Sequence, residues 1–273
     1  MPQDGRDGSR RGQPAGIDRA REQSGKRPPV PLRRQQAGSA PVAPEPEWPP
    51  GATVDLPRGV LHELRNQVRG GRDLVDQVAK ALTIGGDAID DGQPEIAVTY
   101  LEWAKHQAPR SSAIREALGI ASYLTEDYAS AITELQAYKR MTGHRDQNHV
   151  LADCVRAADG DTSRIGELVG EMDAARDGVD RYTEGIIVWA SALADAGDVG
   201  AGRAVLRRAL EGPAAGRVDR GSAEEHDLRL WYVAGDLAQR AGEADQAEVW
   251  FARVAAHTGD YFDVEQRLRA LRG

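Results

Sequence analysis

The chain has 273 residues, with 35 Lys and Arg residues against 43 Asp and Glu residues, and a formal net charge of −8. No run of about 18 apolar residues occurs and no apolar stretch follows the first basic residues, so we expect neither a membrane span nor a secretory signal. The single cysteine, Cys154, excludes an intramolecular disulfide and is typical of a reducing cytoplasm, where we expect the protein to act.

The first 55 residues form a segment of distinct composition. Residues 1–55 are rich in Gly, Pro, Gln, Ser and Arg and contain few large aliphatic side chains. Such a segment buries too little apolar surface to offset its ordering entropy, so we predict a disordered arm. Within it we expect Trp48 to be a free side chain, and docking of its ring onto the body or a partner is the alternative.

The arm carries two weak binding signals. Its first forty residues hold nine basic and four acidic side chains, a net charge of +5, whereas residues 56–273 carry −10. The arm could therefore contact nucleic acid or another anionic surface weakly through residues 1–40. The stretch "PPVPLR" (28–33) matches a Pro-x-x-Pro-x-Arg ligand pattern, but a plain linker is the favoured interpretation.

The body from residue 56 onward has helical periodicity. Pro57 suits the first turn of a helix, apolar residues then recur at spacings of three and four, and Gly70 and Gly71 end a helix predicted at 57–68. No later stretch alternates with period two over a useful length. The sequence therefore predicts an all-α body over residues 56–273.

Turn positions recur through the body at a spacing close to 34 residues. They are Gly92, Glu126, Gly160, Gly197 and Gly242, separated by 34, 34, 37 and 45 residues. Five residues after each turn lies a small or aliphatic residue, four further on a large apolar one, and seven before each turn a mostly small one. The three sets are Ala97, Ala131, Ile165, Gly202 and Ala247; Leu101, Leu135, Val169, Leu206 and Phe251; and Gly85, Gly119, Asp153, Ala190 and Gly235. Because antiparallel helices approach closely where side chains are small, these offsets predict helix hairpins.

The repeat resembles the tetratricopeptide repeat, which has a period of 34 residues. "LGIASYLTEDYASAITELQAY" (118–138) and "LWYVAGDLAQRAGEADQAEVWFARV" (230–254) carry the resemblance. It implies a right-handed α-solenoid of about five hairpins with capping helices at both ends. The units are expected at about 78–111, 112–145, 146–179, 183–216 and 228–261, with a C-terminal cap at 262–272 and an exposed loop at 211–223.

The third unit departs most from the pattern, because Asp153 replaces a small residue and Gly166 follows Ile165. A closer likeness to tetratricopeptide proteins of high-GC actinobacteria, with a Pro/Gly/Arg-rich arm before the repeats, is carried by residues 113–124 and 135–161. It implies no assigned activity.

The sequence contains no convincing catalytic or cofactor-binding constellation. Cys154 lies near His149 and Asp153 in sequence but not on a shared helix face, so we expect a structural thiol. His144 and His149 lack the spacing of a zinc site, and the glycines of "GDVGAGRAV" (197–205) follow a helix instead of the strand that a dinucleotide site needs. We therefore expect no enzyme activity, no metal and no cofactor.

The resemblance implies that the first helices of successive units line a concave groove that binds a protein or peptide. The sequence gives mixed and acidic side chains there, so we expect a basic or apolar peptide ligand, of which the chain's own arm is one candidate. The predicted groove residues are Glu116, Ile120, Tyr123, Gln147, Val150, Glu184, Ser191, Asp195, Arg229, Tyr232, Asp236 and Arg240. The predicted function is a noncatalytic interaction scaffold, and the alternative is a nucleic-acid-associated factor that uses its basic arm.

Overall fold

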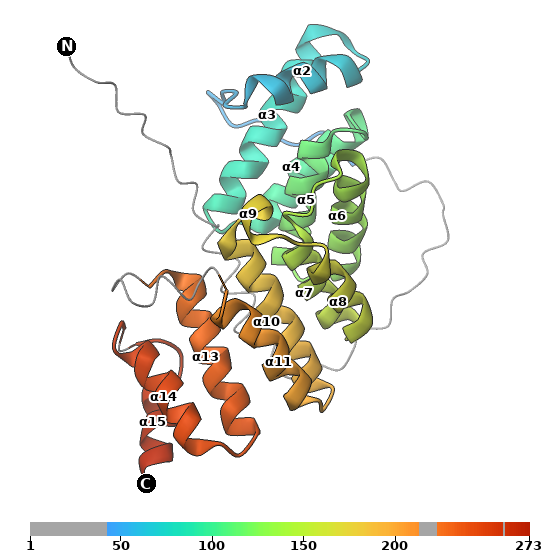
Figure 1. Cartoon of the computed structure of the whole chain (residues 1–273). Helices are drawn as coiled ribbons and strands as arrows, with labels where there is room; N and C mark the ends of the chain where they lie inside the picture. The colour runs from blue at the N-terminus through green and yellow to red at the C-terminus, as the bar shows by residue number, and fades with distance from the viewer. Residues whose placement is uncertain (1–42, 213–222, 259) are drawn as a thin grey trace, which may run out of the picture. The chain divides into compact units, whose positions relative to one another are not determined.

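The computed structural model describes residues 43–212, 223–258 and 260–273, and these residues are all-helical (Figure 1). They contain thirteen helices and no strand, which confirms the all-α prediction. The predicted arm up to residue 42 and most of the loop predicted at 211–223 lie outside the described residues. Within the ranges that are described, no helix is both long and apolar enough to cross a membrane.

The described residues form two compact units, 43–134 and 135–273, whose boundary falls inside α6 (Tyr128–Thr142). The first unit also contains α2 (Arg58–Gln67), α3 (Gly71–Asp90), α4 (Pro94–Gln107) and α5 (Ser112–Leu124). The second unit also contains α7 (Asn148–Ala158), α8 (Thr162–Gly170), α9 (Ala174–Asp177), α10 (Val179–Asp195), α11 (Val199–Leu210), α13 (Glu225–Arg240), α14 (Ala244–Ala255) and α15 (Val264–Arg272).

Helices that are adjacent in sequence pack in pairs. In the first unit α3 contacts α4 and α5, and in the second unit the pairs α7–α8, α10–α11 and α13–α14 are in contact. The first helices of these pairs also touch one another, since α10 contacts both α7 and α13, and α15 packs on α14. The helix predicted at 57–68 is α2, and the cap predicted at 262–272 is α15.

The five predicted turn residues share one backbone conformation. Each has a positive φ, from 61° at Glu126 to 97° at Gly197. At four of them the next residue donates its amide to the carbonyl five positions earlier, as Gln93 does to Ala88 at 2.7 Å. This pattern is the Schellman motif, which ends a helix and lets the chain reverse. The other three such bonds join Asp127 to Ser122, Asp198 to Leu193 and Glu243 to Ala238.

The small residues of the repeat lie where two helices approach most closely. A Cβ atom added to Gly85 would lie 2.6 Å from Cγ of Leu101, and one added to Gly235 would lie 2.8 Å from Cε1 of Phe251. These are the pairs that the offsets from the turns predict. At Gly202 the added atom would meet the carbonyl oxygen of Ala190 at 2.6 Å.

The third hairpin departs from this packing, as the sequence indicates. Asp153 is buried and accepts a hydrogen bond from Nε of Arg156 at 3.0 Å, so a charged pair replaces the close apolar contact. Gly166 leaves room for the ring of Trp189 on α10, because a Cβ there would lie 2.9 Å from Cζ2 of that ring. The short helix α9, which the sequence does not predict, follows α8.

The prediction that Trp48 is free is wrong. Its ring lies edge-on to Trp103 of α4 at a centroid distance of 5.3 Å and 6.1 Å from the ring of Tyr100. Val54 and Leu56 pack against the core of the first unit, and the amide of Asp55 donates to Oγ1 of Thr83 at 3.2 Å. Residues 43–56 are therefore part of the folded body, and we call them the strap.

Candidate functional site

Seven charged side chains form a continuous series of ion pairs across α7, α10, α13 and α15, all within the second unit. We call this series the charged ladder. In order along the series, its members are Asp153, Arg156, Asp195, Arg240, Asp236, Arg267 and Asp263.

The first half of the charged ladder joins the first helices of two successive hairpins and reaches a third. Arg156 on α7 lies 3.0 Å from Asp153 through Nε and 3.6 Å from Asp195 on α10 through Nη1. Asp195 in turn lies 3.1 Å from Nη1 of Arg240 on α13. Arg240 also donates to the carbonyl oxygen of Ala194 at 2.5 Å, where a cation complements the negative C-terminal end of α10.

The second half of the charged ladder joins α13 to the C-terminal helix. Asp236 lies 3.8 Å from Arg240 on its own helix and 2.7 Å from Nη1 of Arg267 on α15. Arg267 also pairs with Asp263 at 3.0 Å. Asp263 accepts a hydrogen bond from the hydroxyl of Tyr232 at 2.8 Å. Burial and this bond raise the pKa of Tyr232 to about 12, so its hydroxyl stays a donor at neutral pH.

The charged ladder borders a hollow of about 410 Å³ between α13 and α15. The guanidinium of Arg267 lines the hollow, and its central carbon lies 5.4 Å from the ring centroid of Tyr232 and 5.3 Å from that of Phe251. This cation therefore stacks on two aromatic rings, and the other side chains that line the hollow are mostly polar. The lining residues are Asp236, Gln239, Arg240, Asp263, Gln266, Arg267 and Ala270.

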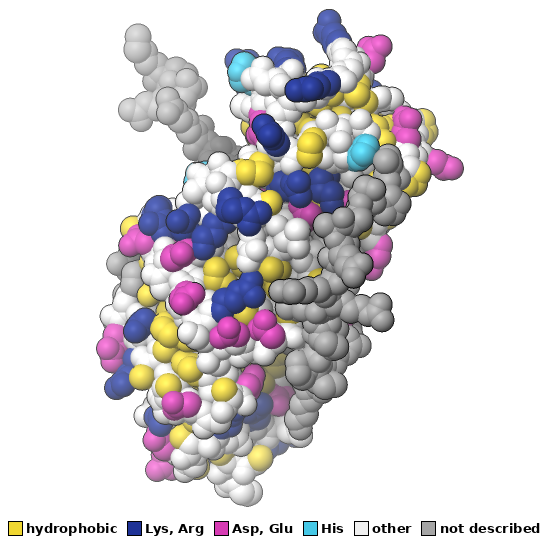
Figure 2. All heavy atoms as spheres, turned by 90° about the vertical axis from the view of Figure 1, so that its right-hand side faces the viewer, with side chains coloured by type: hydrophobic (Ala, Val, Ile, Leu, Met, Phe, Trp, Pro, Cys, Tyr) yellow, Lys and Arg dark blue, Asp and Glu magenta, His cyan; other side chains and the backbone are white. Residues whose placement is uncertain are grey.

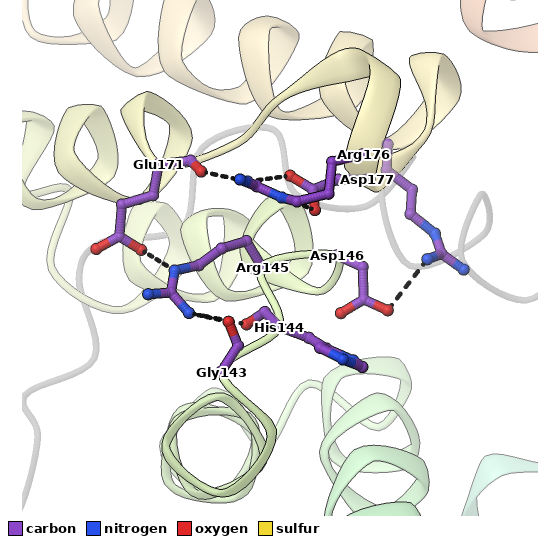
Figure 3. Close-up of a pocket in the computed structure, with 8 residues that line it drawn as sticks. Gly143, His144, Arg145, Asp146, Glu171, Arg176 and Asp177 are labelled. Carbon is purple, nitrogen blue, oxygen red and sulfur yellow. Dashed lines mark hydrogen bonds and ion pairs between the residues drawn. The ribbon is translucent and has the colours of Figure 1, made fainter.

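A second hollow, of about 540 Å³, lies beside the loop between α6 and α7 (Figure 3). Three arginines line it, and each is paired with a carboxylate of the same lining. Arg145 lies 3.0 Å from Glu171, Arg181 lies 3.2 Å from Asp146, and Arg176 lies 2.7 Å from Asp177. The remaining lining residues are Gly143 and His144.

Further hydrogen bonds beside this second hollow hold the segment 171–177 together. Arg176 donates to the carbonyl oxygen of Glu171 at 2.7 Å, and Asp177 accepts from the amide of Asp173 at 2.8 Å. Hydrogen bonds from Arg176 hold the pKa of the buried Asp177 carboxyl below its usual range, and the amide of Asp173 adds to this effect. Because all three arginines are matched by carboxylates, the arrangement fits a structural clasp better than an anion site.

The predicted groove residues divide into three groups. Asp195, Tyr232, Asp236 and Arg240 lie together, as members of the charged ladder or in contact with it. Four others are buried and have little surface to offer a ligand, which is a correction to their expected place on an open face. The buried four are Tyr123, Gln147, Val150 and Glu184.

The remaining predicted residues are partly buried. Arg229 lies 3.3 Å from the buried carboxylate of Glu184, so this pair joins α13 to α10. Ser191 lies on α10, whereas Glu116 and Ile120 lie on α5 of the first unit. These last two belong to the first unit, whereas the charged ladder lies in the second.

Sequence reasoning did not place four members of the charged ladder at a binding site, although a signal for them exists; these are Asp153, Arg156, Asp263 and Arg267. Asp153 and Arg156 are three residues apart, and the pairs Asp236–Arg240 and Asp263–Arg267 are four apart, which is the spacing at which opposite charges meet on one helix face. The pairs within a helix were readable from the sequence. The links from one helix to the next were not, because they depend on packing.

Cys154 is fully buried, and burial together with the neighbouring Asp153 raises the pKa of its thiol well above the usual range. This agrees with the expected structural thiol, because only the thiolate is an effective nucleophile. Among the residues that the structure describes, no group of three or more His, Cys, Asp or Glu side chains could hold a metal ion.

No protein-family model matches the chain, and no curated protein matches it. The resemblance to tetratricopeptide repeats therefore rests on the residues and offsets described above.

Proposed function

We propose that the chain is a noncatalytic protein-interaction scaffold of tetratricopeptide type, an α-solenoid that acts in the cytoplasm. In this proposal the charged ladder and the adjoining hollow bind an extended or helical peptide of a partner protein. The observation that carries the proposal is the charged ladder itself. It follows the first helices of three successive hairpins and the terminal helix, where the tetratricopeptide resemblance expects a ligand.

The exposed part of the charged ladder contributes little to the stability of the fold. Asp195 and Arg240 are exposed, and exposed ion pairs contribute only about 0–1 kcal/mol each. Such pairs exchange partners readily, so side chains of a peptide can replace them at little cost. Charges arranged in this way contribute more to specificity and association rate than to affinity.

The sign of the charged ladder favours a basic peptide. Four aspartates stand against three arginines, which leaves a net charge of −1 along the series. The hollow lined by Arg267 and Ala270 offers room for one large side chain of the ligand. We therefore propose a peptide with spaced Lys or Arg residues and one apolar or aromatic anchor.

Two charge reversals test the proposal. A partner captured from native cytoplasm and then purified is titrated against the chain and against the variants Asp195→Lys and Arg240→Glu. We expect Asp195→Lys to bind the basic peptide at least about tenfold more weakly, which corresponds to about 1.4 kcal/mol, and Arg240→Glu, which makes the series more negative, to bind it more tightly. The control is Arg269→Glu, whose side chain is 79% exposed on α15 outside the charged ladder, and it should bind as the unaltered chain does. A partner that binds all four proteins equally would refute the proposed site.

Nucleic-acid association through the arm is the competing function, supported by the net charge of +5 in the first forty residues. A salt titration separates the two. Binding through phosphate contacts falls steeply between 50 mM and 200 mM salt, whereas peptide binding at the charged ladder should fall modestly.

A further inference from the structure

The helix α4 carries two apolar stripes. Its first stripe faces the core of the first unit through Ala97, Leu101 and Ala104, all of which are fully buried. A second stripe runs along another face at the same spacing of four and three, through Ile96, Tyr100 and Trp103. A surface helix needs only one apolar face to pack, so the second stripe requires another explanation.

The strap covers this second stripe. Trp48 lies against the rings of Tyr100 and Trp103, and Trp103 is only 4% exposed. Pro46, two residues before Trp48, is buried as well. Ile96 at the other end of the stripe is 45% exposed, so the apolar face continues past the contacts that Trp48 makes.

Polar groups of the body bind the backbone and one carboxylate of the strap. The hydroxyl of Tyr100 donates to the carbonyl oxygen of Glu47 at 2.5 Å. Nε2 of Gln77 on α3 donates to Oε1 of Glu45 at 3.3 Å, and the same oxygen accepts from Nε1 of Trp48 at 2.9 Å. The hydrogen bond from Tyr100 to a main-chain carbonyl fixes the backbone path of the strap. The hydrogen bonds to Glu45 favour a carboxylate at position 45 of the strap.

We propose that Gln77, Tyr100 and Trp103 form a binding site for extended peptides of the type Glu-Pro-x-Trp, and that the strap occupies this site as an intramolecular ligand. A proline-rich segment loses little entropy on binding, because its backbone is already restricted. Aromatic side chains that contact the peptide, together with a hydroxyl that binds its carbonyl, are the elements of proline-rich peptide recognition. This site lies in the first unit and is independent of the charged ladder.

The strap is part of the same chain as its binding site, and this covalent link determines how the site responds to an external peptide. A short flexible linker holds its ligand at an effective concentration of about 1 mM. An external peptide with the sequence of the strap must compete with that concentration, so its apparent Kd for the intact chain cannot fall much below about 1 mM. If the strap is weakened, the same peptide binds with its intrinsic affinity.

The test uses the full chain and a fluorescent peptide with the sequence of residues 43–51, APEPEWPPG. We expect the variant Trp48→Ala to bind this peptide at least about tenfold more tightly than the intact chain does, as measured by anisotropy. A peptide with Ala in place of its Trp should not bind. The matched control is Trp250→Ala, which removes a partly buried tryptophan from α14 and should leave the weak binding of the intact chain unchanged.

A second pair of variants distinguishes a specific loss of the strap contact from a general loss of folding. Pro46→Gly keeps the aromatic anchor while loosening the strap, and it should also bind the peptide more tightly than the intact chain. Tyr100→Phe in the Trp48→Ala chain removes the hydroxyl that binds the peptide carbonyl and should weaken binding several-fold. Equal peptide binding by the intact chain, Trp48→Ala and Pro46→Gly would overturn the proposal, and so would the absence of binding to both variants.

Discussion

The packing of the first hairpin can be tested by adding one methyl group at either of two adjacent glycines. Gly85 and Gly86 both lie within α3. A Cβ on Gly85 would lie 2.6 Å from Cγ and 2.8 Å from Cδ2 of Leu101, whereas a Cβ on Gly86 would meet nothing within 4 Å. The variants Gly85→Ala and Gly86→Ala therefore differ in packing while sharing the same change in backbone freedom.

The two substitutions should differ in their effect on the free energy of unfolding. Alanine is favoured over glycine in a helix interior by about 1 kcal/mol, and both variants gain this amount. Gly85→Ala also overpacks a helix contact, at a cost of about 1–3 kcal/mol. Leu101 is fully buried, so it has no solvent-facing position to move into. We expect Gly86→Ala to stabilise the protein and to be about 1–3 kcal/mol more stable than Gly85→Ala.

Urea denaturation followed by circular dichroism measures the difference. With a slope near 2 kcal/mol/M, a gap of 2 kcal/mol separates the two midpoints by about 1 M. Identical midpoints would refute the predicted register, since α3 and α4 would then not meet at Gly85 and Leu101. The slopes should agree, because neither substitution changes the surface exposed on unfolding.

Three further predictions concern titratable groups. The thiol of Cys154 should react with a thiol reagent only after denaturation, because it is buried and its pKa is raised, and rapid labelling of the native protein would contradict this. Asp177 has a lowered pKa in the folded protein, so its contribution to stability is complete above about pH 4 and is lost as the pH falls through the folded value. Asp177→Asn should accordingly destabilise the protein at pH 7 and lose this difference in strong acid, as thermal melts at several pH values can show. The pKa of Tyr232 is raised to about 12, so its contribution is complete below about pH 10 and is lost as the pH rises towards 12. Tyr232→Phe should cost about 1–2 kcal/mol at pH 7 through the bond to Asp263, and the cost should shrink in alkali.

The helices and turns were predictable because local chemistry determines them. Four of the five turns are marked by glycine, which adopts positive φ without a steric penalty, and the structure gives all five turn residues that conformation. Glu126 is the one turn residue that is not glycine, and only its spacing of 34 residues from Gly92 and from Gly160 identifies it as a turn. The contacts Gly85–Leu101 and Gly235–Phe251 follow from counting outward from these turns.

The strap could not be predicted in the same way. Its composition is that of a disordered segment, and its local sequence indicates only an extended backbone. What holds Trp48 in place is a second apolar stripe on α4, about fifty residues later in the chain. The three members of that stripe, Ile96, Tyr100 and Trp103, are visible in the sequence. Their partner is not, because any apolar segment could cover them.

The buried groove residues show a similar limit. A position on the first helix of a hairpin can face an open surface or the next hairpin, and the sequence does not distinguish these cases for Glu184. In the structure this carboxylate is buried beside Arg229, and it serves the contact between α10 and α13. On the face shown in Figure 2, Lys and Arg side chains lie next to Asp and Glu side chains at several places. Charge pattern alone therefore does not mark a binding face.

The third hairpin connects the irregularity of the repeat with the proposed site. Asp153 occupies a position where other hairpins hold Gly or Ala, and a buried carboxylate cannot make the same close apolar contact. It binds Arg156, whose guanidinium also reaches Asp195 on the next hairpin. Asp153, which breaks the pattern of small residues, is thus also the first member of the charged ladder. Because a buried charge needs a partner, Asp153 pairs with Arg156, and this partner extends the series to the neighbouring helix. By this reasoning, departures from a repeat pattern point to candidate binding residues better than its regular positions do.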